Sequence, residues 1–190
     1  MATRILTVPN QITFLRLAFL PFFLIFIYYD RYAWALAILV AAALSDLLDG
    51  VLARRLNQKT ALGAYLDPIA DKLLLSSSFL MLAVKGKLYW WLTILVLSRD
   101  VLILLISAVI LVTVGYRPLP PSLYGKITTG AQIVLVFFVI ATAAAPLPWL
   151  EAIESALVYL AAAFTIFSGL HYSFVIARRL HAGSLPPADD

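Results

Sequence analysis

Long apolar runs alternate with short polar links along the chain of 190 residues. Each run holds roughly 20 residues, the length of α-helix that crosses the hydrocarbon core of a bilayer. The six runs occupy residues 14–29, 32–52, 62–84, 88–114, 125–145 and 153–176. The pattern therefore predicts an all-α integral membrane protein with six transmembrane helices. We expect residues 1–182 to form a single domain and residues 183–190, with their prolines and acids, to be a disordered tail.

The basic residues in the links predict an orientation. With the N-terminus in the cytoplasm, eight of the fourteen Lys and Arg residues fall on the cytoplasmic side and three on the other side, while three lie within spans. The eight are Arg4, Arg54, Arg55, Lys59, Arg117, Lys126, Arg178 and Arg179. Since positive charge accumulates in cytoplasmic loops, we expect both termini inside the cell.

Composition agrees with a membrane protein and excludes other classes. Hydrophobic residues make up 63% of the chain, and its mean hydropathy is +0.98. The net charge of +4 is scattered over loops, so it does not indicate a nucleic-acid partner. Cysteine is absent, which excludes disulfides. A compact chain in which no small-residue cleavage site follows the first run, and which shows no transit peptide, suggests a bacterial plasma membrane.

Four of the ten acidic residues form two close pairs. Asp46 and Asp49 end the second run, and Asp67 and Asp71 begin the third, so each pair occupies one face of its helix. At an effective dielectric constant near 20, two carboxylates roughly 4 Å apart repel by about 4 kcal/mol, so a cluster of four needs a counter-charge. Carboxylate oxygens favour Mg²⁺ or Mn²⁺ over zinc. One alternative is a pair of helix ends whose acids face the cytoplasm; another is a cation transporter.

Eight positions at fixed spacing resemble the signature of the CDP-alcohol phosphotransferases, integral membrane enzymes that make phospholipids. In this chain they read Asp46-x2-Asp49-Gly50-x2-Ala53-Arg54-x8-Gly63-x3-Asp67-x3-Asp71. The resemblance extends from Pro9-Asn10 and Arg16 through Arg99-Asp100 to Lys126 and Gln132. It implies a six-helix bundle that usually dimerises, with a polar metal-containing cavity on the cytoplasmic side.

The resemblance also implies roles for these residues. Asp46, Asp49, Asp67 and Asp71 would bind two metal ions, and Asp71 would also be the general base that takes the proton of the acceptor hydroxyl. The residues expected to bind the CDP moiety are Asp46, Gly50, Ala53, Arg54 and Gly63. The small ones have an alternative role in helix packing, which is common in membranes.

The acceptor alcohol is less closely defined by the sequence. The donor is expected to be CDP-diacylglycerol, and residues 66–72 look most like two branches, one using glycerol 3-phosphate and the other phosphatidylglycerol. The first branch typically has an Arg and a Lys where this chain has Ser107 and Thr128. That difference favours phosphatidylglycerol as the acceptor, and so do the pair Arg99-Asp100 and the aromatic-rich end around His171-Tyr172. The enzyme would then be a cardiolipin synthase. The alternative is a phosphatidylglycerophosphate synthase.

Three cationic residues are candidates for binding the phosphate of the acceptor or of a membrane lipid: Arg16, Arg99 and Lys126. Arg16 has an equal alternative, in which its side chain extends to the lipid headgroups. Arg99 and Asp100 are neighbours on a helix and do not face each other, so we expect them to pair with different partners. A scaffold that kept the fold without activity is a further alternative, weakened by the presence of all four acids and Arg54.

Overall fold

The computed structural model describes residues 8–56, 61–114 and 123–181, and the side chains of residues 17–45, 70–105 and 124–172. Within these ranges the chain forms six α-helices and no strand. They are α1 (Val8–Tyr28), α2 (Tyr32–Leu56), α3 (Ala61–Val84), α4 (Trp90–Val114), α5 (Leu123–Ala144) and α6 (Pro148–His181). The predicted all-α class and the six predicted runs are therefore confirmed. The expected disordered tail, residues 183–190, lies outside the described residues.

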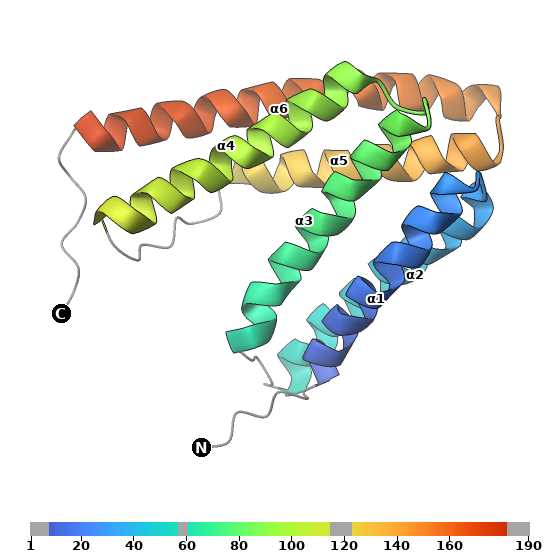
Figure 1. Ribbon diagram of the computed structural model, residues 1–190, viewed down its shortest axis with the longest axis horizontal. Helices are drawn as coiled ribbons and strands as arrows, with labels where there is room; N and C mark the ends of the chain where they lie inside the picture. Colours follow the sequence, from blue (N-terminus) through green and yellow to red (C-terminus); the bar gives the residue numbers. More distant parts are fainter. Residues whose placement is uncertain (1–7, 57–60, 115–122, 182–190) are drawn as a thin grey trace.

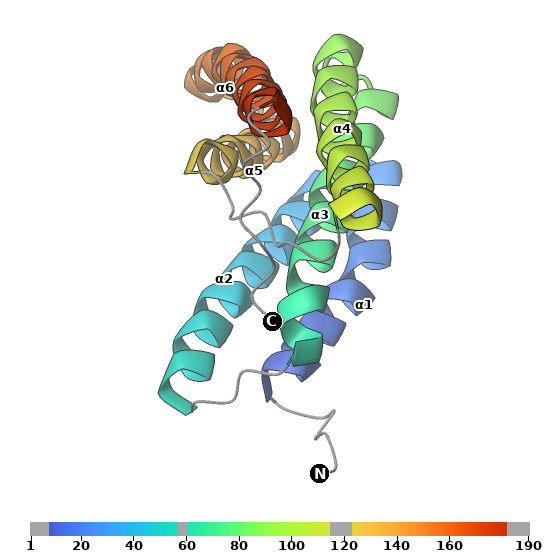
Figure 2. The same ribbon diagram turned by 90° about the vertical axis from the view of Figure 1, so that its left-hand side faces the viewer.

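The six helices form two arms that meet at one end (Figure 1). One arm holds α1, α2 and α3, in which α1 packs on both α2 and α3. The other holds α4, α5 and α6, in which α6 packs on both α4 and α5. The arms are joined by packing of α2 and α3 on α5 and of α3 on α4. They diverge away from the turns α1–α2, α3–α4 and α5–α6, as the second view also shows (Figure 2).

The turns α1–α2 and α3–α4 share one backbone geometry. Asp30 and Gly86 have φ values of 57° and 65°. In each turn the next residue donates its N–H to the carbonyl five positions back, from Arg31 to Phe26 at 2.8 Å and from Lys87 to Leu82 at 2.8 Å. This left-handed cap satisfies carbonyls at the helix end that would otherwise lack a donor.

The Lys85 side chain ties these two turns together. The Lys85 ammonium donates to the carboxylate of Asp30 at 2.8 Å and to the backbone carbonyl of Tyr28 at 3.0 Å. Beneath it, a continuous core of fully buried side chains includes Phe23, Ile27, Phe79, Leu82, Leu92 and Leu135. The end of the molecule that holds the turns α1–α2, α3–α4 and α5–α6, here named the turn end, is therefore the packed end.

The outer surface is strongly apolar, whereas several polar side chains lie inside. Exposed residues include Phe22, Trp34, Leu104, Tyr159 and Leu170, while Ser78, Thr93, Asp100, Thr128, Gln132, Thr165 and Ser168 are buried. Within the described residues, Tyr124–Ala144 and Pro148–Tyr172 are each long and apolar enough to cross a bilayer, and Leu17–Tyr28 and Tyr32–Ser45 are shorter apolar segments. Six helices are thus observed, and the crossing of the membrane by all six stays a prediction.

Candidate active site

The two aspartate pairs lie on helical backbone, as their spacing predicts. Asp46 and Asp49 belong to the C-terminal half of α2, and Asp67 and Asp71 to the first half of α3. Asp71 is exposed and has an interaction partner. The side chains of the other three acids lie outside the described residues, and so do those of Arg16, Gly50, Ala53, Arg54 and Gly63.

A metal centre of all four acids is therefore an expectation that the described side chains do not test. Among these side chains, no group of three or more His, Cys, Asp or Glu is close enough to hold a metal ion. The donor set itself fits a hard divalent cation, because it consists of carboxylate oxygens at one-turn spacing on two helices.

A network of charged side chains links α3, α4 and α6 close to Asp71. Lys72 forms an ion pair with Asp100, whose side chain is only 5% exposed. The same oxygen of Asp100 accepts a hydrogen bond at 3.1 Å from the Arg99 guanidinium. A second nitrogen of that guanidinium donates to the Ser168 hydroxyl at 2.7 Å. The network thus joins three helices through one buried carboxylate.

This network corrects one expectation and adds one residue. Arg99 and Asp100 do contact each other, because the long arginine side chain brings its guanidinium back to the carboxylate of the next residue. The prediction that they would pair only with different partners is therefore wrong, although each residue also has a second partner, Ser168 for Arg99 and Lys72 for Asp100. Lys72 was not among the expected site residues. A lysine within an apolar span is itself a signal, since it needs an anionic partner there.

An open groove lies over α4, α5 and the C-terminal half of α6. Its volume is about 490 Å³, and its lining comprises Arg99, Ile103, Gly125, Lys126, Thr129, Gly130, Ile133 and Tyr172. Two of the three predicted phosphate-binding residues, Arg99 and Lys126, therefore line one groove. The wall between them is mainly aliphatic and glycine backbone, so the groove can receive both a charged group and an apolar chain.

An aromatic cluster surrounds His171, the residue before Tyr172 of the groove lining. The His171 ring lies 4.7 Å from the Tyr124 ring and 6.4 Å from the Phe167 ring, measured between centroids. Nearby, the Thr128 side chain is 1% exposed, and its hydroxyl donates to the carbonyls of Tyr124 and Phe164. The Thr128 hydroxyl is therefore committed to packing α5 against α6.

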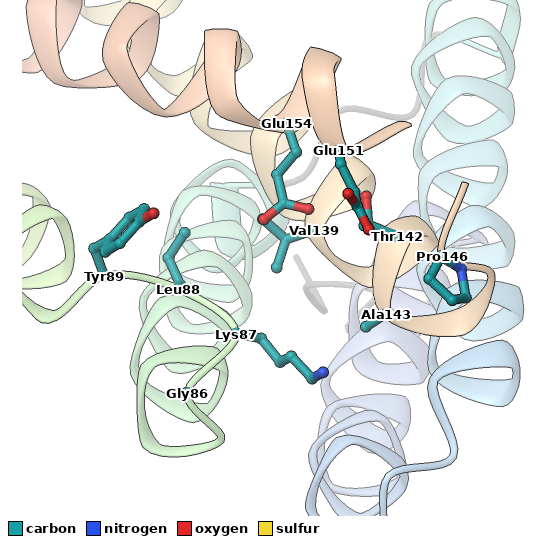
Figure 3. A pocket seen from close by; sticks show the side chains of 10 residues that line it. All are labelled: Gly86, Lys87, Leu88, Tyr89, Val139, Thr142, Ala143, Pro146, Glu151 and Glu154. Carbon is teal, nitrogen blue, oxygen red and sulfur yellow. The ribbon is translucent and has the colours of Figure 1, made fainter. Parts of the chain in front are cut away.

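A second cavity, of about 380 Å³, lies at the turn end (Figure 3). Glu151 and Glu154 of α6 face it together with Lys87 from the α3–α4 turn. Of the predicted site residues whose side chains are described, Asp71, Arg99 and Lys126, none lines it. The helices α2 and α3 run from this end to the far end of their arm, where α2 ends and α3 begins, so this cavity is separate from the candidate active site (Figure 1).

Comparison with known proteins identifies the family. The model of the CDP-alcohol phosphatidyltransferase family matches residues 6–167. The chain belongs to this family. As a CDP-alcohol phosphatidyltransferase it is an enzyme, a transferase of phospholipid synthesis, and its relatives are membrane proteins that generally depend on a divalent metal ion. The resemblance inferred from the aspartate signature is confirmed.

Curated relatives of this phosphatidyltransferase carry two kinds of name. A Mycobacterium tuberculosis protein named "Probable phosphatidylglycerophosphate synthase" is 34% identical over 187 residues, covering 93% of this chain and 83% of the relative. A CDP-diacylglycerol–glycerol-3-phosphate 3-phosphatidyltransferase of Salmonella typhimurium is 34% identical over 172 residues, covering 87% and 92%. A CMP-forming cardiolipin synthase of Streptomyces coelicolor is 40% identical over 132 residues, covering 66% and 61%.

Proposed function

We propose that this phosphatidyltransferase moves the phosphatidyl group of CDP-diacylglycerol to phosphatidylglycerol and releases CMP, which makes it a cardiolipin synthase. The acceptor hydroxyl forms a new P–O bond to the phosphatidyl phosphorus, the bond from that phosphorus to CMP breaks, and the hydroxyl proton passes to a carboxylate. The observation that carries the choice of acceptor is the groove over α4, α5 and α6, whose described lining residues include two cations and an aliphatic wall.

The proposed roles of the four signature aspartates follow from the chemistry of carboxylates. Asp46, Asp49, Asp67 and Asp71 would hold two Mg²⁺ or Mn²⁺ ions, which neutralise charge on the diphosphate as CMP leaves. Asp71 takes the proton of the acceptor hydroxyl, a role that requires its carboxylate to lie within hydrogen-bond reach of that hydroxyl.

The remaining signature residues are proposed to hold the nucleotide. Arg54 forms a forked pair with a phosphate of the CDP moiety. Gly50 and Ala53 lack bulk, so the cytidine can approach the α2 backbone. Gly63 allows α3 to come close to its neighbour at the start of the helix.

The charge of the groove favours a phosphodiester acceptor. Among the lining residues whose side chains are described, two are cationic, Arg99 and Lys126, and Arg99 is already paired with Asp100. Glycerol 3-phosphate carries a phosphate dianion, which needs several cationic groups when it is held away from water. Thr128 offers no charge and its hydroxyl bonds backbone carbonyls. Phosphatidylglycerol has a single negative charge and acyl chains that fit against Ile103 and Ile133.

The second candidate function is synthesis of phosphatidylglycerophosphate from glycerol 3-phosphate. It is favoured by two relatives that align over about nine-tenths of this chain, one named a probable phosphatidylglycerophosphate synthase and the other a glycerol-3-phosphate 3-phosphatidyltransferase. The two functions share the donor, the metal ions and Asp71, so they differ only in the groove.

The deciding experiment is product analysis with purified protein in detergent. CDP-diacylglycerol and Mg²⁺ or Mn²⁺ are supplied with either phosphatidylglycerol or glycerol 3-phosphate. We expect cardiolipin and CMP from the first mixture alone. A paired comparison of Lys126→Met with Lys126→Arg tests the groove, since only the loss of charge should raise KM for phosphatidylglycerol. Turnover with glycerol 3-phosphate alone would establish the second candidate.

Location and assembly belong to the same proposal. We propose a homodimer in a bacterial inner membrane. Both termini face the cytoplasm, and so does the aspartate end, which is the end where α2 finishes and α3 begins. The orientation is supported by the excess of Lys and Arg in the links of that side. Protease cleavage of a C-terminal tag from one side of sealed vesicles would test it, with a tag in the α5–α6 turn as the opposite control.

A further inference from the structure

Helices α3 and α4 are joined by two polar contacts that define one register. The Thr93 hydroxyl donates to the Phe79 carbonyl at 3.4 Å, and Lys72 pairs with Asp100. The two contacts are seven residues apart on each helix, which is about two turns or roughly 10 Å of rise. Lys72 and Phe79 therefore occupy one face of α3, and Thr93 and Asp100 the facing side of α4.

The two contacts differ in what lies around them. Thr93 and Phe79 are fully buried in the packed core near the turn end. Lys72 is 35% exposed and lies about two turns further from the α3–α4 turn than Phe79 does. The ion pair of Lys72 with Asp100 is thus a polar connection between the arms at the residue that follows Asp71.

Asp100 connects this contact to the groove. Its side chain is 5% exposed and accepts from both Lys72 of α3 and Arg99 of its own helix. Arg99 lines the groove and donates to Ser168 of α6. A chain of contacts therefore runs from α3 through Asp100 to the groove wall formed by α4 and α6.

We propose that Asp100 is a positioning residue for the transfer reaction. By holding Lys72, the residue that follows Asp71, it fixes the depth and rotation of this part of α3. The carboxylate of Asp71 is thereby placed relative to an acceptor bound in a groove that belongs to the other arm. This inference rests on the proposed function, since it takes Asp71 as the base and the groove as the acceptor site.

The nature of the contact favours positioning over stability. The pair of Lys72 with Asp100 contributes little net stability compared with well-packed apolar residues, because the buried carboxylate loses its hydration. What it supplies is a defined geometry, since the carboxylate needs both of its cations in place. Geometry is also what the reaction needs, because a displacement of about 1 Å at reacting groups can lower a rate by about 100-fold.

The test compares Asp100→Asn, Lys72→Met, the double variant and Lys72→Arg as the matched control. We expect each single charge-removing variant to lower kcat about 10- to 100-fold. The KM for CDP-diacylglycerol should stay within about twofold, because the nucleotide contacts lie elsewhere. The double variant should be no slower than the slower single one, and Lys72→Arg should restore most of kcat. Equal kcat per folded molecule in all variants, or additive losses in the double variant, would overturn the proposal.

A second measurement does not depend on turnover. The chain has no cysteine, so pairs introduced at the exposed positions Leu73 of α3 and Leu105 of α4 carry spin labels without background. We expect one narrow distance distribution in the parent and a broader one with Asp100→Asn. An unchanged distribution would refute the positioning role. If the parent releases no CMP with either acceptor, the proposed function fails, whereas the distances still report on Asp100.

Discussion

Gln132 of α5 offers a direct test of how polar groups act inside this helical bundle. Its side chain is fully buried, and its amide nitrogen donates to the Thr165 hydroxyl of α6 at 3.1 Å. That hydroxyl in turn donates to the Ala161 carbonyl at 2.7 Å. The amide oxygen of Gln132 is buried without a hydrogen-bond partner among the described residues. One end of the amide is thus satisfied and the other is not.

This asymmetry predicts opposite effects for two substitutions. Gln132→Leu loses one interhelical hydrogen bond, worth roughly 0.6 kcal/mol in a membrane bundle. It also removes the unpartnered oxygen, which costs roughly 1–3 kcal/mol. We therefore expect this variant to be as stable as the parent or more stable by up to about 2 kcal/mol. Thr165→Val keeps the shape but leaves the whole amide without a partner, so we expect a loss of about 1–2 kcal/mol.

The assay is reversible unfolding by SDS in mixed micelles, followed by far-ultraviolet circular dichroism. The double variant serves as the control, because removing both groups should give a stability close to that of Gln132→Leu. A larger loss for Gln132→Leu than for Thr165→Val would refute the reasoning, since it would mean that the amide oxygen makes a contact stronger than the bond to Thr165.

Three further results are expected. Asp71→Asn should lower the rate of CMP release by at least about 100-fold with unfolding unchanged, because amide nitrogen cannot accept the hydroxyl proton; activity above a tenth of the parent would contradict the assignment. Chelation by EDTA should abolish CMP release, and Mg²⁺ or Mn²⁺ should restore it, whereas Zn²⁺ should not. The hydrogen bond from Lys85 holds the pKa of Asp30 below its usual value. Its stabilisation is therefore present above about pH 4 and lost as pH falls through the lowered pKa. The stability difference between parent and Lys85→Met should shrink over that acidic range, and a difference independent of pH would contradict this.

The helices were predictable because each must be apolar along a length set by the bilayer. The observed helix boundaries differ from the predicted ones where residues outside the apolar run still favour a helix. The helix α1 begins at Val8 and includes Pro9, since proline fits the first turn, where its missing N–H has no partner to lose. The helix α6 continues to His181, past the expected end at residue 176, through basic residues that favour a helix C-terminus.

The candidate site was predictable only in part. The carboxylate signature depends on spacing within single helices, which sequence displays directly. The groove depends on how α4, α5 and α6 pack, and nothing in the local sequence brings Arg99 and Lys126 to one surface. The contact between Arg99 and Asp100 was missed because periodicity describes where side chains start and not how far a long one reaches.

The tryptophans give the molecule a built-in optical asymmetry. All four, Trp34, Trp90, Trp91 and Trp149, lie in the first turns of α2, α4 and α6, and all are exposed. Those turns share one end of the molecule (Figure 1). Intrinsic fluorescence therefore reports on that end alone. A quencher such as iodide, added outside sealed vesicles, distinguishes the two directions of insertion without any label. Tryptophan emission does not report on events at the aspartate end unless a new fluorophore is placed there.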